Sequence, residues 1–126
     1  MNVLLVGIGG ALGSIARHGV GVAIARAAPA GVTPYATMAV NLAGCLVIGV
    51  LAGLVASHRL VLAPGMRAFV FVGVLGGFTT FSAFSLELVM LMQRGQFGYA
   101  ALYLILSVAL GVTGLIFGLA VMRLTA

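Results

Sequence analysis

The chain has 126 residues, of which 63% are hydrophobic and 6% are charged, and its mean hydropathy is +1.34. This composition excludes a solvated globular domain and indicates a membrane protein. The formal net charge of +5 comes from six arginines against one glutamate, and the arginines are scattered along the chain, which argues against binding to nucleic acid.

Four apolar segments divide the chain into predicted transmembrane helices. A bilayer core about 30 Å thick requires roughly 20 apolar residues per helix, so the chain has room for about four spans. Short breaks rich in Arg, Pro and Gly suit turns at the membrane surface. A buried soluble bundle would need polar helix faces that the sequence lacks. We therefore predict an all-α membrane protein, a single transmembrane domain over residues 1–126, with helices at 3–25, 35–56, 66–92 and 99–122.

The first segment, "MNVLLVGIGGALGSIARHG", has no basic region before its apolar run, so we expect it to remain in the mature protein. Arg17 and His18 near its end are polar groups at membrane depth and hence functional candidates. Every segment also carries two glycines four residues apart, a spacing that lets helices approach closely in lipid. The pairs are Gly9 with Gly13, Gly49 with Gly53, Gly73 with Gly77, and Gly114 with Gly118.

The second segment contains one strongly polar residue, Asn41 in "MAVNLAG". Its amide offers two donors and one acceptor. Two interpretations stay open: an interhelical hydrogen bond that stabilises the bundle by about 1 kcal/mol, or a donor to an anion in a pore. The single Cys45 excludes a disulfide within the chain and a CxxC metal site, and we expect a small buried hydrophobic residue there.

The third segment contains the stretch "LGGFTTFSAFSLE", from Leu75 to Glu87. Gly76 and Gly77 precede Thr79 and Thr80, all poor helix formers, so we predict that the third helix is broken in the middle of the membrane. Broken helices at that depth persist only where protein or a cavity covers them. Their freed carbonyls and amides are suited to bind ions.

Aromatic and hydroxyl side chains follow this break. Phe81 and Phe84 share a helical face, with Phe78 about one turn earlier. Because the edge of an aromatic ring is electropositive, two ring edges in a narrow passage could contact a desolvated anion. The alternative is that these rings face lipid or pack in the core. Additional hydroxyl donors are Thr80, Ser82, Ser85 and, on the fourth segment, Ser107 and Thr113.

Glu87 is the only acidic residue. A lone carboxylate in a span costs about 2.5 to 3.5 kcal/mol unless it is paired or near the interface, so we expect pairing with Arg17 or partial hydration. A proton-coupled transporter would use such an acid as its carrier, whereas an anion channel would keep it outside the narrow path.

The arginines also bear on orientation. If both termini share one side of the membrane, that side holds Arg59, Arg67 and Arg123, and the other holds Arg26 and Arg94, with Arg17 expected partway into the first helix. The positive-inside rule then gives almost no preferred orientation. The sequence therefore predicts a chain that inserts both ways round, and an antiparallel homodimer of opposed copies.

The segments "GGALGSIARHG", "VNLAG" and "GGFTTFSAFSLE" resemble the CrcB/Fluc family of fluoride channels, in the same order and over essentially the whole chain. The resemblance implies four transmembrane helices in an antiparallel, dual-topology homodimer with two pores. It implies a multi-pass protein of the plasma membrane, the bacterial inner membrane, that exports cytoplasmic fluoride passively and selectively.

The resemblance also implies roles for particular residues. Asn41 matches the asparagine that contacts fluoride, and Phe81 and Phe84 match the paired phenylalanines that line each pore. Gly76 and Thr79 match positions whose backbone carbonyls hold a structural Na⁺ at the dimer interface. Other matches are the hydroxyls of Thr80, Ser82 and Ser107, the pore-side Tyr103, and Arg17 in the first helix. Two departures affect the outer pathway: His18, where an aromatic residue is usual, and Gly111, where some members place a hydroxyl.

We expect no enzyme activity, because the chain has no constellation of catalytic side chains. Two rival functions are retained. A proton-coupled exporter of small cations would resemble the small multidrug resistance proteins, which rely on an acid in the first helix that is absent here. A non-transporting assembly subunit would produce no ion flux.

Overall fold

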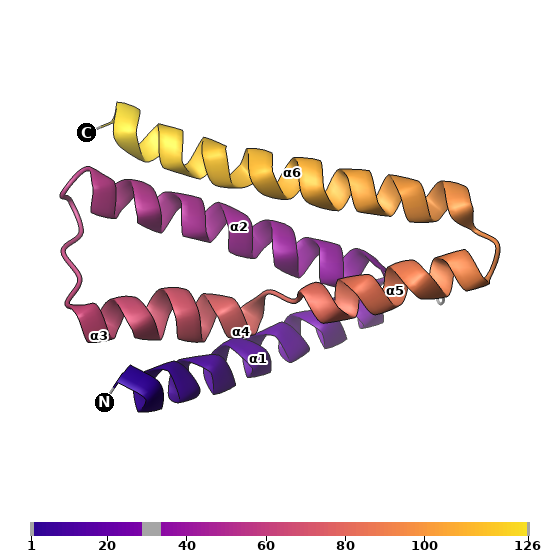
Figure 1. Ribbon diagram of the computed structural model, residues 1–126, viewed down its shortest axis with the longest axis horizontal. Coiled ribbons are helices and arrows are strands. Elements are labelled where there is room, and N and C mark those ends of the chain that lie inside the picture. Colours follow the sequence, from indigo (N-terminus) through magenta and orange to yellow (C-terminus); the bar gives the residue numbers. More distant parts are fainter. Residues whose placement is uncertain (1, 29–33, 126) are drawn as a thin grey trace.

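A computed structural model of the chain describes residues 2–28 and 34–125. Within these ranges the chain is helical and contains no β-strand. Three helices are continuous, α1 (Asn2–Ala27), α2 (Pro34–Ala56) and α6 (Phe97–Leu124). The third span is divided into α3 (Pro64–Arg67), the π-helix η1 (Ala68–Leu75), α4 (Gly76–Phe78) and α5 (Phe81–Gln93) (Figure 1).

Four helical segments are long and apolar enough to cross a membrane: Asn2–Ala27, Pro34–Ala56, Pro64–Gln93 and Phe97–Leu124. Their mean hydropathies are 1.5, 2.3, 1.8 and 2.5. The third begins at Pro64, a favourable first helical position because the missing N–H of proline would have no helical partner there. The turn expected between the first two predicted helices includes residues 29–33, which lie outside the described residues.

The helices pack as two close pairs, α1 along η1 and α4, and α2 along α6 (Figure 1). Glycines permit this approach. A Cβ atom on Gly9 would lie 2.6 Å from the Phe69 carbonyl oxygen, and one on Gly118 would lie 2.8 Å from the Leu46 carbonyl oxygen. The predicted close packing is therefore confirmed for three glycine pairs. It is wrong for Gly114, because nothing lies within 4 Å of a Cβ atom placed there.

The two described connections hold the helix ends together. After α2, Arg59 donates to the Met122 carbonyl and to Thr125 Oγ1 at the end of α6. A cation is favourable there because the carboxyl end of a helix carries partial negative charge. Between α5 and α6, Gly95 has φ of +72°, a left-handed conformation that glycine adopts without strain. The α2–α3 connection, the start of α1 and the end of α6 lie at the same end of the bundle (Figure 1).

Two residues of extended backbone separate α4 from α5. Thr79 has φ −79° and ψ 156°, and Thr80 has φ −149° and ψ 120°. The Thr80 side chain then caps the new helix by accepting a hydrogen bond from Ala83 N at 3.2 Å. The preceding π-helix was not predicted from the sequence, and such wide turns occur frequently at functional sites. The third span is thus irregular on the amino-terminal side of Phe81.

Candidate functional site

Asn41 of α2 binds the extended backbone directly. Its Nδ2 donates to the Thr80 carbonyl over 2.9 Å, and the Thr80 N–H donates to Asn41 Oδ1 over 2.7 Å. Both backbone groups of Thr80 are therefore satisfied by one amide side chain. The interhelical hydrogen bond considered for Asn41 is present, and one of the two Nδ2 hydrogens is not used by Thr80.

The carbonyls of Gly76 and Thr79 are the oxygens that the family resemblance assigns to Na⁺. In an α-helix they would accept from the N–H groups of Thr80 and Ala83, four residues later. Those two amides donate instead to Asn41 Oδ1 and Thr80 Oγ1. The described residues contain no cluster of three or more His, Cys, Asp or Glu side chains. Backbone carbonyls released from the helix are suitable ligands for a hard cation, so the chain fits this assignment.

Glu87 is held by hydroxyl groups of two other helices. Its Oε1 accepts from Thr37 Oγ1, and its Oε2 accepts from Tyr103 Oη, both over 2.7 Å. Of the two expected arrangements, pairing with Arg17 is wrong, because Arg17 Nη2 instead approaches Ser14 Oγ at 3.5 Å. The other, partial hydration, stays a prediction for this half-buried side chain. Hydroxyl donors from α2 and α6 therefore satisfy the carboxylate of α5.

Thr37, which is buried, was not predicted from the sequence to belong to this site. It lies four residues before Asn41 and therefore on the same face of α2. This four-residue spacing from Asn41 was the only feature of the sequence that could have pointed to Thr37.

Replacing Tyr103 with phenylalanine removes one of the two donors to Glu87. We expect the free energy of unfolding to fall by about 1 to 3 kcal/mol, because a carboxylate oxygen loses its partner in a partly buried site. Thermal unfolding of the purified protein in detergent measures this change. The matched control is Tyr99→Phe, one turn earlier on α6 and 66% exposed, which should leave stability unchanged. Equal losses in both variants would contradict the role assigned to the Tyr103 hydroxyl.

The two phenylalanines are neighbours with different surroundings. The ring centroids of Phe81 and Phe84 are 5.7 Å apart, and that of Tyr103 is 5.0 Å from Phe84. Phe84 is 6% exposed, whereas Phe81 is 79% exposed on the single chain. Phe84 therefore belongs to the interior beside Tyr103, while Phe81 projects from the surface of the chain.

Of the hydroxyl groups predicted to line the site, only some lie within hydrogen-bond distance of one another. Thr80 Oγ1 and Ser82 Oγ share a hydrogen bond of 3.3 Å. Ser107 Oγ is buried and has no hydrogen-bond partner among the described residues. Because an unpaired buried hydroxyl is costly, this atom is a candidate ligand for a species that the chain itself does not supply.

The departures from the family pattern lie at two places. Gly111 is buried on α6, where a Cβ atom would be 3.5 Å from Cys45 Sγ on α2. Cys45 was expected to be a small buried hydrophobic residue, and the structure buries it only in part. His18 is exposed on α1, and Arg17 beside it is half-buried.

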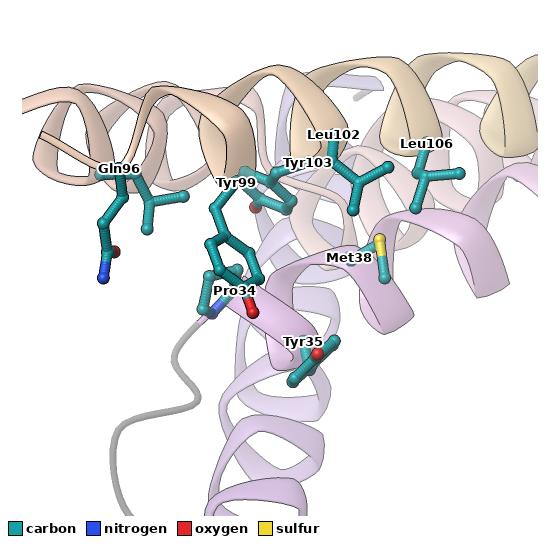
Figure 2. A pocket seen from close by; sticks show the side chains of 9 residues that line it. Pro34, Tyr35, Met38, Gln96, Tyr99, Leu102, Tyr103 and Leu106 are labelled. Carbon is teal, nitrogen blue, oxygen red and sulfur yellow. The ribbon is translucent and has the colours of Figure 1, made fainter.

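A pocket of about 380 Å³ opens beside Tyr103, between the beginning of α2, the end of α5 and the beginning of α6. Figure 2 shows the Tyr99 ring extending across it toward Pro34. Tyr103 lines this pocket and also bonds Glu87. The pocket therefore adjoins the hydrogen-bonded carboxylate. Its lining residues are Pro34, Tyr35, Met38, Leu91, Gln96, Tyr99, Leu102, Tyr103 and Leu106.

Four apolar helices that enclose hydrogen-bonded polar side chains define a multi-pass membrane protein. The sequence model described as "CrcB-like protein, Camphor Resistance (CrcB)" matches residues 4–119. The chain belongs to this family, and the resemblance to the CrcB/Fluc proteins is confirmed.

Curated relatives match over nearly their whole length. The chain is 49% identical over 123 residues to "Fluoride-specific ion channel FluC 2" of Nitrobacter hamburgensis, covering 98% of both chains. It is 52% identical over 119 residues to "Fluoride-specific ion channel FluC" of Novosphingobium aromaticivorans, covering 94% of this chain and 93% of the relative. The Rhodospirillum centenum protein of the same name is 50% identical over 121 residues, covering 96% and 94%. These relatives are named as channels and not as enzymes.

Proposed function

We propose that the chain is the subunit of a fluoride-selective channel of the bacterial inner membrane. The observation that carries this proposal is a connected set of polar and aromatic groups, Thr37, Glu87, Tyr103 and Phe84, in a chain whose relatives are named fluoride-specific ion channels. Fluoride enters cells as neutral HF and stays behind as the ion. The membrane potential, about 2.3 kcal/mol per charge at 100 mV, is then sufficient to drive passive export.

A small, strongly hydrated anion can pass only where donors replace its water. Asn41 contributes its second Nδ2 N–H, since the first is used by Thr80. Ser107 contributes its buried hydroxyl, which has no partner in the described part of the chain. The remaining contacts come from the hydroxyls of Thr80 and Ser82 and the ring edges of Phe81 and Phe84.

The working unit is an antiparallel homodimer with two pores. Backbone that is not helical cannot face lipid inside a bilayer, so the extended residues between α4 and α5 require a protein cover. Their own chain buries Thr80 and half-buries Thr79. Gly76 and Phe81, on either side of this segment, are exposed on the single chain, and a second copy would cover them. Three arginines lie at the end of the bundle that holds the start of α1 and the end of α6, two lie at the other end, and Arg17 lies within α1, which supports insertion in both orientations.

A structural Na⁺ at the dimer interface would be held by the Gly76 and Thr79 carbonyls of both copies. Support comes from the helical donors of these carbonyls, which are diverted to Asn41 and Thr80. The cation would offset the repulsion between the partial negative charges of carbonyl oxygens from two chains.

Glu87 acts as a fixed acceptor in this proposal. Two hydroxyl donors of 2.7 Å hold its carboxylate, so it orients Thr37 and Tyr103 beside the pathway. A proton-coupled exporter would instead require Glu87 to exchange these partners for protons and substrate during each cycle.

Fluoride-electrode recording tests the proposal. Liposomes containing the purified protein and loaded with potassium fluoride should release fluoride once valinomycin allows potassium to leave, and they should retain chloride under the same conditions. A proton-coupled exporter would need a proton gradient and would fail after Glu87→Gln. The absence of any flux would favour an assembly subunit and reject the channel.

A further inference from the structure

The Asn41 amide lies where a helical hydrogen bond is missing. In an uninterrupted helix the Thr80 N–H would donate to the Gly76 carbonyl. It donates instead to Asn41 Oδ1 over 2.7 Å, and Asn41 Nδ2 donates back to the Thr80 carbonyl over 2.9 Å. A single side chain of α2 therefore removes Thr80 from the helical hydrogen-bond pattern.

We propose that Asn41 is a positioning residue for the cation site: by binding the Thr80 N–H, it keeps the Gly76 carbonyl free to bind Na⁺. This inference rests on the proposed function, in which the Gly76 and Thr79 carbonyls hold the cation. The Thr80 hydroxyl acts in the same way on the next turn, because it accepts from Ala83 N, the amide that would otherwise reach the Thr79 carbonyl.

A second contact shows that α2 shapes this segment. Gly44 follows Asn41 by three residues on the same face of α2, and a Cβ atom at Gly44 would collide with the Thr79 side chain. The Thr79 hydroxyl in turn donates to the Leu75 carbonyl over 2.9 Å. Two successive turns of α2 thus hold Thr79 and Thr80 in their extended conformation.

The two proposed ion sites then share one residue. Asn41 presents its unused Nδ2 hydrogen to fluoride, and through Oδ1 it controls whether the Gly76 carbonyl is available to sodium. Loss of fluoride efflux in an Asn41 variant would have two possible causes. Sodium binding must therefore be measured separately from flux.

The test is the thermal unfolding midpoint of the full-length protein in detergent at rising sodium chloride, with choline chloride keeping the ionic strength constant. Asn41→Ala is expected to raise the sodium concentration for half-maximal stabilisation by about 10- to 100-fold, as when a group that orients a metal ligand is removed. Asn41→Asp keeps an oxygen for the Thr80 N–H, so it should retain most of the sodium response while losing fluoride efflux. Ser14→Ala is the matched control, because Ser14 donates to the neighbouring Gly77 carbonyl at 3.4 Å, and it should respond like the wild type.

An Asn41→Ala variant with the wild-type sodium response would overturn the inference. A wild-type protein that sodium does not stabilise would overturn it too, together with the proposed cation site. Fluoride efflux from wild-type liposomes would still decide the channel function independently. If Asn41→Ala does not fold, the carbonyl ¹³C resonances of the wild-type protein test whether sodium binds the carbonyls that the inference requires. Sodium should shift those of Gly76 and Thr79, and a shift at Gly77 without one at Gly76 would reject the assignment.

Discussion

Replacing Gly118 with alanine is expected to destabilise the folded protein by about 1 to 3 kcal/mol or more, although alanine is the better helix former. A Cβ atom at this position would lie 2.8 Å from both the Leu46 carbonyl oxygen and Val50 N. These are backbone atoms of α2 and cannot move aside as a flexible side chain would. The new methyl group therefore forces α2 and α6 apart along their whole contact.

Gly114→Ala provides the matched control, because the two glycines form one pair on the same helix. Nothing lies within 4 Å of a Cβ atom at Gly114, so its replacement should stabilise the chain by about 0.8 to 1 kcal/mol through helix propensity alone. The midpoints of thermal unfolding in detergent should thus move in opposite directions. Destabilisation of similar size by both substitutions would show that the spacing of the glycines, and not the contact with α2, sets the effect.

These two glycines show what the sequence can and cannot predict about the fold. The length and hydropathy of each apolar segment were enough to predict four long apolar helices, because a bilayer leaves few other solutions. The four-residue spacing correctly marked close helix contacts. It did not separate Gly114 from Gly118, because the crossing of α2 and α6 decides which residues of one face meet a neighbour.

The candidate site, like the fold, could be predicted from the sequence only in part. Sequence analysis identified the polar residues that are unusual in an apolar chain, Asn41 and Glu87 among them, and it identified Thr79 and Thr80 as poor helix formers. Of the two arrangements expected for Glu87, pairing with Arg17 was wrong. Thr37 was not predicted, because a hydroxyl is common in membrane helices and carries no signal by itself. Hydrogen-bond partners far apart in the sequence follow from helix packing. Whether Thr79 and Thr80 lie in the middle of the membrane stays a prediction.

Replacing either phenylalanine of the pair with isoleucine is expected to abolish fluoride efflux, because an aliphatic side chain has no electropositive ring edge to offer the ion. The effects on stability should differ. Phe84 is 6% exposed and packs against Tyr103, so Phe84→Ile should also lower the free energy of unfolding by about 1 to 3 kcal/mol. Phe81 is 79% exposed on the single chain, so Phe81→Ile removes no packing within the chain and should lower the free energy of unfolding less than Phe84→Ile does.

Phe117→Ile is the control, since this ring is 63% exposed on α6 and lies outside the aromatic pair. Fluoride efflux from liposomes, together with size-exclusion chromatography to verify assembly, separates loss of conduction from loss of structure. A Phe81→Ile protein that assembles and unfolds like the wild type but conducts no fluoride would tie the exposed ring to the pore. Since its own subunit leaves that ring uncovered, the pore that it lines would then have to be completed by a second copy of the chain. Unchanged efflux in both variants would reject the aromatic pore.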